Sequence, residues 1–295
     1  MKNILILGSS SLISKSFIDI VDKELYIIYA ASRTNSNNEK INHLSWNIYM
    51  HDKDDFVKSL PDIIDCIIVA AWDGNSREYR NNHEINMNCA NYIYSQLSLI
   101  CENKDVKQII LFGSQAEYGI ASGVVNEEYI IDFSTLSAYG KAKLWLYNQL
   151  KKNKICNSIT EIRFNNVYGY CQNKSQLLLE VIKKISNNEK FVFYSDCSQY
   201  LDYLYVSDAA CAVIDAIKYN LEGIYNVGSS EVRTLKEFME ILANKMKVIN
   251  YVEYGNKREK PGFIFDSNKF RNLTGWNDEI RFSDGIDKVI KCLNK

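Results

Sequence analysis

The sequence has very little of what metal centres, disulfide frameworks and membrane spans require. It contains only three histidines, and its eight cysteines are scattered with no Cys-x-x-Cys pair. This pattern predicts reduced thiols, a cytoplasmic location and no metal site. No apolar stretch approaches the ~18 residues of a membrane-spanning helix, and a strand-like run follows almost directly after Met1. We therefore expect neither a membrane span nor a signal peptide.

The chain has no excess of positive or negative charge and few linker-forming residues. The chain has 35 Lys and Arg against 36 Asp and Glu, a net charge of −1, and no basic block. This balance argues against nucleic acid or a membrane surface as a partner. Only two prolines and no low-complexity run are present, so no linker is evident in the 295 residues. The length suits one large domain or two closely joined ones.

The first feature that is present is an apolar run, residues 3–7, which ends at Gly8. This is typical of a buried parallel strand, and a helical apolar pattern follows from Leu12. A strand, a small-residue turn and a helix N-terminus together offer a pyrophosphate site. The turn resembles the Gly-x-x-Gly-x-x-Gly turn of short-chain dehydrogenases, with Ser11 and Ser14 in place of two glycines. Because serine disfavours positive φ, a plain serine N-cap stays open as the alternative.

Strand-like and helix-like segments alternate through the first half. Residues 25–30, 65–72 and 107–114 are expected to be strands, residues 160–164 a sixth strand, and a helix is expected to start at Asn86. Such spacing predicts βαβ units and a Rossmann-type, doubly wound parallel sheet, in which ligands bind at the carboxyl ends of the strands.

Arg33 follows the second strand, where an NAD-binding fold places a carboxylate for the ribose 2′-hydroxyl. An arginine suits a 2′-phosphate instead, which favours NADP(H) as the cofactor. A solvated loop arginine is the alternative.

Tyr139 and Lys143 stand four residues apart and would share one face of a helix. A free phenol, with a reference pKa near ~10, is a poor proton carrier at neutral pH. A neighbouring ammonium group favours the phenolate, as an acid/base catalyst requires. With 20 Tyr and 35 Lys and Arg, about two such spacings arise by chance, so the spacing alone equally fits an ordinary helix surface.

The segment GSQAEYG at residues 113–119, followed by Tyr139-x-x-x-Lys143, resembles the extended short-chain dehydrogenase/reductase family of nucleotide-sugar enzymes. Residues 163–169, 202–208 and 266–276 follow in the order of that family, so the resemblance covers essentially the whole chain. It implies a dinucleotide-binding domain over residues 1–166. It also implies a smaller, interleaved α+β domain over 167–295, which binds mainly the nucleotide sugar and returns some segments to the Rossmann sheet.

The resemblance further implies roles for individual residues, and none of these residues is assigned to a metal. The catalytic residues would be Ser114, Tyr139 and Lys143. The cofactor-binding residues would be Gly8, Ser10, Ser11, Leu12, Ile13, Ser32, Arg33, Asn47, Ile48, Ala70, Ala71, Trp72, Asn86, Tyr139, Lys143 and Phe164. The substrate-binding residues would be Trp72, Gln115, Asn166, Arg258 and Lys260.

The basic contacts to the substrate depart from the family pattern. The family usually has a pyrophosphate-binding arginine where this chain has Leu201. Arg258 and Lys260 stand where the family supplies its second basic contact, and a charged surface loop is the alternative interpretation.

Residues next to Ser114 separate the reactions known in this family. Its dehydratases carry Asp-Glu directly after the Ser/Thr, and its decarboxylases carry Glu in the second of these positions, whereas this chain has Gln115 and Ala116. The 3,5-epimerase-reductases pair a cysteine with a histidine, and no cysteine adjoins Ser114. A 4-keto reductase and a 4-epimerase remain.

We expect NADPH-dependent reduction of a nucleotide-linked 4-keto-6-deoxyhexose, with dTDP favoured as the nucleotide, in surface-polysaccharide sugar biosynthesis. The alternatives are a 4-epimerase with bound NAD and a non-catalytic NADP-binding sensor. The family also implies a homodimer built from the Tyr139 helix and the helix after the fourth strand. Its apolar contacts would be Leu144, Leu146, Leu150, Tyr92, Ile93 and Leu97, unless these residues face their own sheet.

Overall fold

The structure is a computed structural model that describes residues 1–34, 41–50, 53–74, 76, 78–169, 177–248, 252–258 and 262–293. The chain divides into two compact units. Unit 1 comprises Met1–Ile120, Ile130–Arg163 and Ala210–Tyr225, and unit 2 comprises Ala121–Tyr129, Phe164–Ala209 and Asn226–Lys295.

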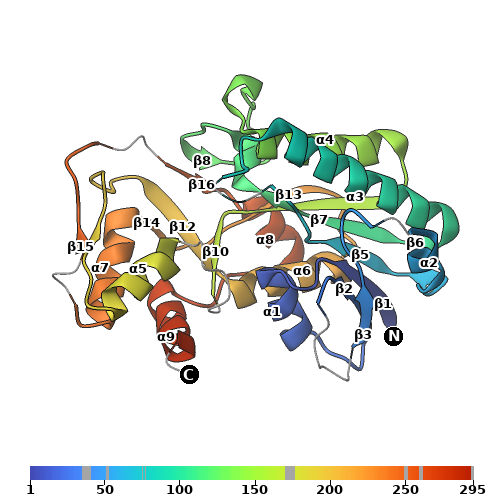
Figure 1. The fold of residues 1–295 in the computed structure, drawn as a ribbon, viewed down its shortest axis with the longest axis horizontal. Helices are drawn as coiled ribbons and strands as arrows, with labels where there is room; N and C mark the ends of the chain where they lie inside the picture. The colour runs from blue at the N-terminus through green and yellow to red at the C-terminus, as the bar shows by residue number, and fades with distance from the viewer. Residues whose placement is uncertain are drawn as a thin grey trace. The chain divides into compact units, whose positions relative to one another are not determined.

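Unit 1 is built around a seven-stranded sheet with the order β13-β9-β7-β5-β1-β2-β3 (Figure 1). Strand β1 pairs in parallel with β2 and β5, β2 with β3, and β5 with β7. The prediction of a Rossmann-type parallel sheet is therefore confirmed. The strands are β1 (Lys2–Leu7), β2 (Tyr26–Ser32), β3 (Asn42–Ser45), β5 (Cys66–Val69), β7 (Gln108–Ser114), β9 (Ser158–Phe164) and β13 (Gly223–Val227).

Helices cover both faces of this sheet. Helices α3 (His83–Asn103) and α4 (Ala138–Asn153) lie side by side on one face, and α1 (Leu12–Ile20) and α6 (Val206–Lys218) lie on the other (Figure 1). Successive side chains of a strand point to opposite faces. Leu5 and Leu7 accordingly pack in the core beneath α3 and α4, while Ile4 and Ile6 are equally buried on the other side. This two-sided burial explains why β1 is a continuous apolar run.

The remaining elements of unit 1 are short. A two-stranded sheet pairs β4 (Ile63–Ile64) with β6 (Asp105–Val106), and α2 (Lys53–Lys58) packs near α3. Two 3₁₀ turns, η1 (Gln115–Tyr118) and η2 (Phe133–Thr135), stand between β7 and α4 in the sequence.

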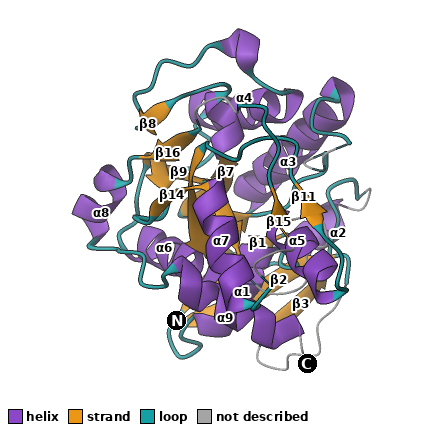
Figure 2. Cartoon of the chain, turned by 90° about the vertical axis from the view of Figure 1, so that its left-hand side faces the viewer, coloured by secondary structure: helices purple, strands orange, loops and turns teal. Residues whose placement is uncertain are grey.

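Unit 2 holds a three-stranded sheet of β10 (Asn166–Tyr168), β12 (Tyr200–Tyr205) and β14 (Val232–Thr234). Helices α7 (Leu235–Lys245) and α9 (Phe282–Leu293) pack against each other (Figure 2). Phe238 lies with its ring centroid 4.6 Å from that of Phe282 and 4.9 Å from that of Tyr203, so aromatic rings form the centre of this unit. The other elements are β8 (Gly123–Val125), β11 (Phe191–Val192), β15 (Val252–Glu253), β16 (Phe263–Phe265), α5 (Leu177–Ser186) and α8 (Asn268–Thr274).

Two local expectations are corrected. The sequence places residues 223–227 in the range 167–295 expected mainly for the smaller domain, but they form β13, the edge strand of the seven-stranded sheet. The helix expected from Asn86 begins three residues earlier, because the side chain of Asn82 accepts a hydrogen bond from the backbone N–H of Ile85 and caps α3 there.

The apolar contacts expected for a dimer are also corrected. Their exposed fractions are 7% for Leu144, 2% for Leu146, 1% for Ile93 and 0% for Leu97 and Leu150, so these side chains fill the core of their own unit. They belong to the helical stripe that covers the sheet. Of the six expected residues, only Tyr92 is exposed, at 39%.

Candidate functional site

The sequence-predicted cofactor residues of unit 1 follow the carboxyl ends of parallel strands. Strand β1 ends one residue before Gly8, β2 ends at Ser32, β5 ends one residue before Ala70, and β7 ends at Ser114. Because β1, β2, β5 and β7 are parallel neighbours, these four positions meet at one edge of the sheet.

The first turn needs glycine at one position only. Gly8 has φ +96°, and a Cβ there would lie 2.5 Å from the backbone nitrogen of Ala71. Ser11 has φ −66°, and Ser14 is a regular residue inside α1. The two serines that replace the family's glycines therefore cause no backbone strain.

The helix N-terminus after this turn fits an anionic group. The hydroxyl of Ser11 accepts a hydrogen bond from the N–H of Ser14 at 3.1 Å, so Ser11 is the N-cap of α1. No described residue accepts a hydrogen bond from the backbone N–H groups of Leu12 and Ile13. Unpaired N–H groups at the positive end of a helix are suitable donors for a phosphate, so the N-cap and the dinucleotide interpretations are compatible.

The predicted residues at the ends of β2 and β3 differ in burial. The Ser32 hydroxyl donates to the carbonyl oxygen of Thr34 at 2.7 Å, and Arg33 is exposed. Asn47 is also exposed, whereas Ile48 is buried and its carbonyl oxygen accepts a hydrogen bond from Gln96 at 2.6 Å. Of these residues, Arg33 offers the free charged group that a phosphate requires.

Trp72, Lys143 and Tyr139 form a compact cluster. The Lys143 ammonium donates to the carbonyl oxygen of Phe112 at 2.6 Å and lies 4.2 Å from the ring centroid of Trp72. The Tyr139 ring meets the Trp72 ring edge to face at 5.7 Å. Lys143 is only 8% exposed, and the carbonyl dipole and the indole face stabilise its buried charge.

Asn86 supports this cluster. Its side-chain oxygen accepts a hydrogen bond from the Trp72 indole N–H at 3.0 Å. Its side-chain nitrogen donates to the carbonyl oxygens of Tyr79 and Asn82 at 3.0 and 2.9 Å. All polar atoms of this fully buried side chain are therefore engaged within the protein, and direct cofactor binding by Asn86 stays a prediction.

Arg80 is a neighbour of Tyr139 that the sequence did not indicate. Its carbonyl oxygen accepts a hydrogen bond from the Tyr139 backbone N–H at 3.0 Å, and its guanidinium carbon lies 5.4 Å from the tyrosine ring centroid. The Tyr139 hydroxyl has no hydrogen-bond partner among the described residues. It is therefore available for a proton transfer.

Ser114 begins the turn η1, which lies against α4. Its Oγ accepts a hydrogen bond from the N–H of Ala116 at 3.2 Å, which leaves the hydroxyl hydrogen free to be donated. Its own N–H donates to Glu117 at 2.7 Å. A Cβ on Gly140, the residue after Tyr139, would lie 2.3 Å from the carbonyl oxygen of Ala116. This close packing brings the Ser114 turn and the Tyr139 helix together.

Four of the predicted residues belong to unit 2. Phe164 is buried, and half-buried Asn166 donates from its side chain to the side-chain oxygen of Asn165 at 3.0 Å and to the carbonyl oxygen of Asp202 at 3.3 Å. Arg258 is exposed, and Lys260 lies outside the described residues.

The structure places an arginine beside the position where the family pattern is broken. Leu201 on β12 is the direct cross-strand partner of Arg233 on β14. Opposed residues of antiparallel strands share a face of the sheet, so Arg233 lies next to the expected arginine position. Its guanidinium pairs with Glu231 at 2.8 Å. Sequence spacing gave no signal for Arg233, because the pairing of β12 with β14 is long-range.

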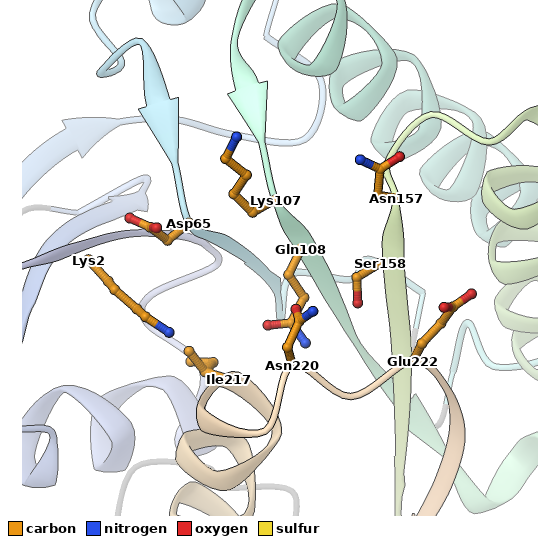
Figure 3. A pocket seen from close by; sticks show the side chains of 9 residues that line it. All are labelled: Lys2, Asp65, Lys107, Gln108, Asn157, Ser158, Ile217, Asn220 and Glu222. Atoms are coloured by element: carbon orange, nitrogen blue, oxygen red, sulfur yellow. The ribbon is translucent and has the colours of Figure 1, made fainter.

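A cavity of about 430 Å³ lies at the amino ends of the strands (Figure 3). Three of its four charged residues are paired within the protein: Lys107 with Asp105, Glu222 with Lys151, and Asp65 with the backbone N–H of Asn3. It lies at the edge opposite Gly8 and Ser114. The lining residues are Lys2, Asp65, Lys107, Gln108, Asn157, Ser158, Ile217, Asn220 and Glu222.

Two kinds of feature are absent from the described ranges. No helix there combines the length and the apolar character needed to cross a bilayer. No group of three or more His, Cys, Asp or Glu side chains is positioned there to hold a metal ion.

The fold and the edge residues define a Rossmann-type protein, and comparison with known proteins gives its family. Residues 4–228 match the profile of the NAD dependent epimerase/dehydratase family, and the chain belongs to that family. A nicotinamide dinucleotide is the cofactor expected for its members.

Individual relatives cover nearly the whole chain. The chain is 23% identical to the dTDP-4-dehydro-6-deoxyglucose reductase of Escherichia coli, over 98% of this chain and 97% of that protein. It is 25% identical to a putative UDP-glucose 4-epimerase of Methanocaldococcus jannaschii, over 98% of both. The UDP-glucuronic acid 4-epimerase from Bacillus cereus, solved with UDP-glucuronic acid and NAD, has the same fold, with a TM-score of 0.83 and 18% identity over 99% of both chains.

Proposed function

We propose that this protein is an NADPH-dependent reductase that converts a nucleotide-linked 4-keto-6-deoxyhexose to the 4-hydroxy sugar, with dTDP favoured as the nucleotide. The observation that supports it most is the Tyr139 hydroxyl, which has no partner among the described residues and belongs to a ring packed beside Trp72 and Lys143. The relative from Escherichia coli, named as a reductase of a dTDP-linked keto sugar, supports the substrate class.

Each of the three predicted catalytic residues, Ser114, Tyr139 and Lys143, has a defined task in this proposal. The cofactor, when bound, supplies a hydride to the keto carbon. Ser114 donates its free hydroxyl hydrogen to the keto oxygen, where negative charge develops. Tyr139 gives that oxygen a proton, and the nearby Lys143 ammonium stabilises the phenolate that is left. Lys143 would also bind the nicotinamide ribose.

The cofactor-binding residues predicted from the sequence would bind NADP(H) at the carboxyl ends of the parallel strands. The free N–H groups of Leu12 and Ile13 would bind the pyrophosphate, and Arg33 would bind the 2′-phosphate of NADP. Arg33 supports NADP over NAD because no carboxylate occupies its place.

In unit 2, we propose that Asn166, Arg258 and Lys260 bind the nucleotide sugar. In unit 1, we propose Gln115 and Trp72 as substrate-binding residues. Arg233 would supply the diphosphate contact that Leu201 lacks, because it is the cross-strand neighbour of that position. The division into a cofactor domain (1–166) and a substrate domain (167–295) is part of the same proposal. A cytoplasmic location and a role in surface-polysaccharide sugar biosynthesis also belong to this proposal.

A nucleotide-sugar 4-epimerase is the second candidate. It is favoured by the 25% identity to the putative UDP-glucose 4-epimerase, which spans 98% of both chains. An epimerase would oxidise and re-reduce its substrate with one retained NAD, using the same tyrosine, so Ser114, Tyr139 and Lys143 do not separate the two activities.

The decisive experiment supplies a dTDP-4-keto-6-deoxy sugar, made in situ by a dehydratase, and follows the loss of NADPH absorbance. The CDP, UDP and GDP forms are tested in parallel. Stoichiometric NADPH consumption with a 4-hydroxy product supports the reductase. Conversion of an ordinary nucleotide sugar to its 4-epimer without net NADPH loss supports the epimerase. Stoichiometric NADP binding without either reaction supports a non-catalytic sensor.

We also propose a homodimer, but through aromatic side chains at the surface of unit 1 in place of the buried leucines. Tyr92 contacts Tyr49 edge to face at 5.0 Å, and Tyr94 contacts Trp145 at 6.1 Å. Tyrosine and tryptophan are enriched in interfaces between proteins. Light scattering at micromolar concentration tests this proposal, since a mass of 34.1 kDa, that of one chain, would exclude a stable dimer.

A further inference from the structure

A buried cluster of three charged residues lies directly behind Ser114. The exposed fractions are 0% for Glu117 and 1% each for Glu161 and Arg163. The Arg163 Nε donates to Glu117 Oε2 at 3.1 Å and to Glu161 Oε2 at 3.0 Å. Three charged groups in the interior cost free energy of folding, and apolar residues of similar volume would often be as stable. A contribution to stability alone is therefore a weak explanation for this cluster.

Burial and mutual contact shift the pKa values of Glu161 and Arg163. Burial, and after it the neighbouring Glu117, raise the pKa of the Glu161 carboxyl well above its usual range. Burial by itself lowers the pKa of Arg163, but Glu117 and Glu161 outweigh it and raise that pKa. Arg163 therefore stays a cation that is held between two carboxyl groups.

Glu117 connects this cluster to the turn that carries Ser114. Its Oε1 accepts the Ser114 backbone N–H at 2.7 Å, while Ser114 Oγ accepts the N–H of Ala116 at 3.2 Å. This is a capping box, in which both ends of the turn are fixed. On the strand side, a Cβ on Gly113 would lie 2.9 Å from Cγ of Arg163, so the backbone before Ser114 packs directly on the cluster.

We propose that Glu117 is a positioning residue for Ser114, with Arg163 holding Glu117 in place. The carboxylate fixes the Ser114 backbone, and the resulting turn aims the serine hydroxyl hydrogen away from η1. This inference rests on the proposed function in one respect, namely that the Ser114 hydroxyl donates to the substrate oxygen.

The first test is Glu117→Met, which keeps the length of the side chain, removes the acceptor of the Ser114 N–H, and leaves Arg163 paired with Glu161. We expect kcat to fall by about 10- to 100-fold, no more than in Ser114→Ala, because an oxyanion donor typically contributes ~10²–10³-fold. The KM for the keto sugar and the Kd for NADPH should each change by less than about twofold, since Glu117 binds neither.

Two control variants separate an effect on the position of Ser114 from an effect on the stability of the protein. Glu161→Gln disturbs the same cluster but leaves the contact of Glu117 with Ser114 intact, so kcat should stay within about twofold of the parent. Glu237→Met removes a second capping box, in which half-buried Thr234 donates its N–H to exposed Glu237 at 2.7 Å at the start of α7. It should lower stability slightly and leave kcat unchanged.

A double-mutant cycle tests whether Glu117 acts through Ser114. In the Ser114→Ala background, Glu117→Met should change kcat by less than about twofold, because the hydroxyl that it positions is gone. If Glu117→Met does not fold, Glu117→Leu replaces it in every arm, since leucine also removes the acceptor of the Ser114 N–H.

Hydrogen exchange of the Ser114 amide, measured without substrate, tests the contact independently of turnover. Faster exchange in Glu117→Met, but not in Glu161→Gln, supports the inference even if the parent reduces no keto sugar and the proposed function fails. Unchanged exchange at Ser114 overturns it. So does a parent-like kcat in Glu117→Met, or an equal loss of kcat in the Ser114→Ala background.

Discussion

Tyr139→Phe separates an effect on catalysis from an effect on structure, because it removes only the phenolic hydroxyl. The phenylalanine ring keeps the edge-to-face contact with Trp72 and the position beneath the Arg80 guanidinium. The lost hydroxyl has no partner among the described residues, so no donor or acceptor is left unpaired. We therefore expect the free energy of unfolding to change by less than about 0.5 kcal/mol, and the midpoint of thermal unfolding by less than about 2 °C.

The effect on turnover should be far larger. General acid catalysis contributes ~10²–10⁴-fold, which corresponds to about 3 to 5 kcal/mol of barrier. We expect kcat to fall by that factor, while the Kd for NADPH, measured by fluorescence titration, stays unchanged. The assay is NADPH absorbance with a 4-keto-6-deoxy nucleotide sugar that a dehydratase makes in situ.

Tyr147→Phe is the matched control. Tyr147 lies on the same helix α4 and is also buried, and burial together with the nearby Glu161 raises its pKa to about 12. Removing its hydroxyl should leave kcat within about twofold of the parent. A Tyr139→Phe variant that reduces the keto sugar as fast as the parent would refute the catalytic assignment. So would an equal loss of activity in Tyr147→Phe.

Three further predictions concern the cofactor, the substrate and pH. Arg33→Ala should weaken NADPH binding by about tenfold, because one charge-assisted hydrogen bond to the 2′-phosphate is lost, and leave NADH binding unchanged. Equal affinities of the parent protein for NADPH and NADH would contradict this prediction. Arg233→Leu should raise the KM for the nucleotide sugar by about tenfold with little change in kcat. Adding Leu201→Arg to this variant should restore the KM. If it does not, the assignment of Arg233 to the diphosphate is wrong. Burial raises the pKa of Asp202 to about 7, so the folded state binds this proton more tightly than the unfolded state does. The Asp202 contribution to the free energy of unfolding should therefore decline from about pH 4 to pH 7, by at most about 4 kcal/mol. Asp202→Asn should remove that decline in melts at pH 5 and pH 8, and an identical pH dependence in parent and variant would exclude it.

The sequence by itself determined the features that depend on local spacing. The apolar run that ends at Gly8 predicted β1 and its turn, and the four-residue spacing placed Tyr139 and Lys143 on one face of α4. The carboxyl-edge position of Ser114 followed from the alternation of strands and helices. These predictions succeeded because residues within about one turn or one strand interact through the geometry of the element itself.

Only the tertiary structure decided the contacts between distant segments. Glu117 meets Arg163 across 46 positions of the sequence, and Trp72 reaches Lys143 from another strand end. The register of β12 on β14 placed Arg233 beside Leu201. No local pattern encodes such pairings, because they depend on which strands and helices become neighbours.

The same reason explains the corrections. The run Gly223–Val227 has the apolar character of a buried strand in either sheet, so its place at the edge beside β9 could not be read from its composition. The leucines of α4 show an apolar stripe, and a stripe does not say whether a sheet or a second subunit covers it. Here the sheet of the same unit covers it, and among the large apolar side chains of α3 and α4 only Tyr92 is exposed.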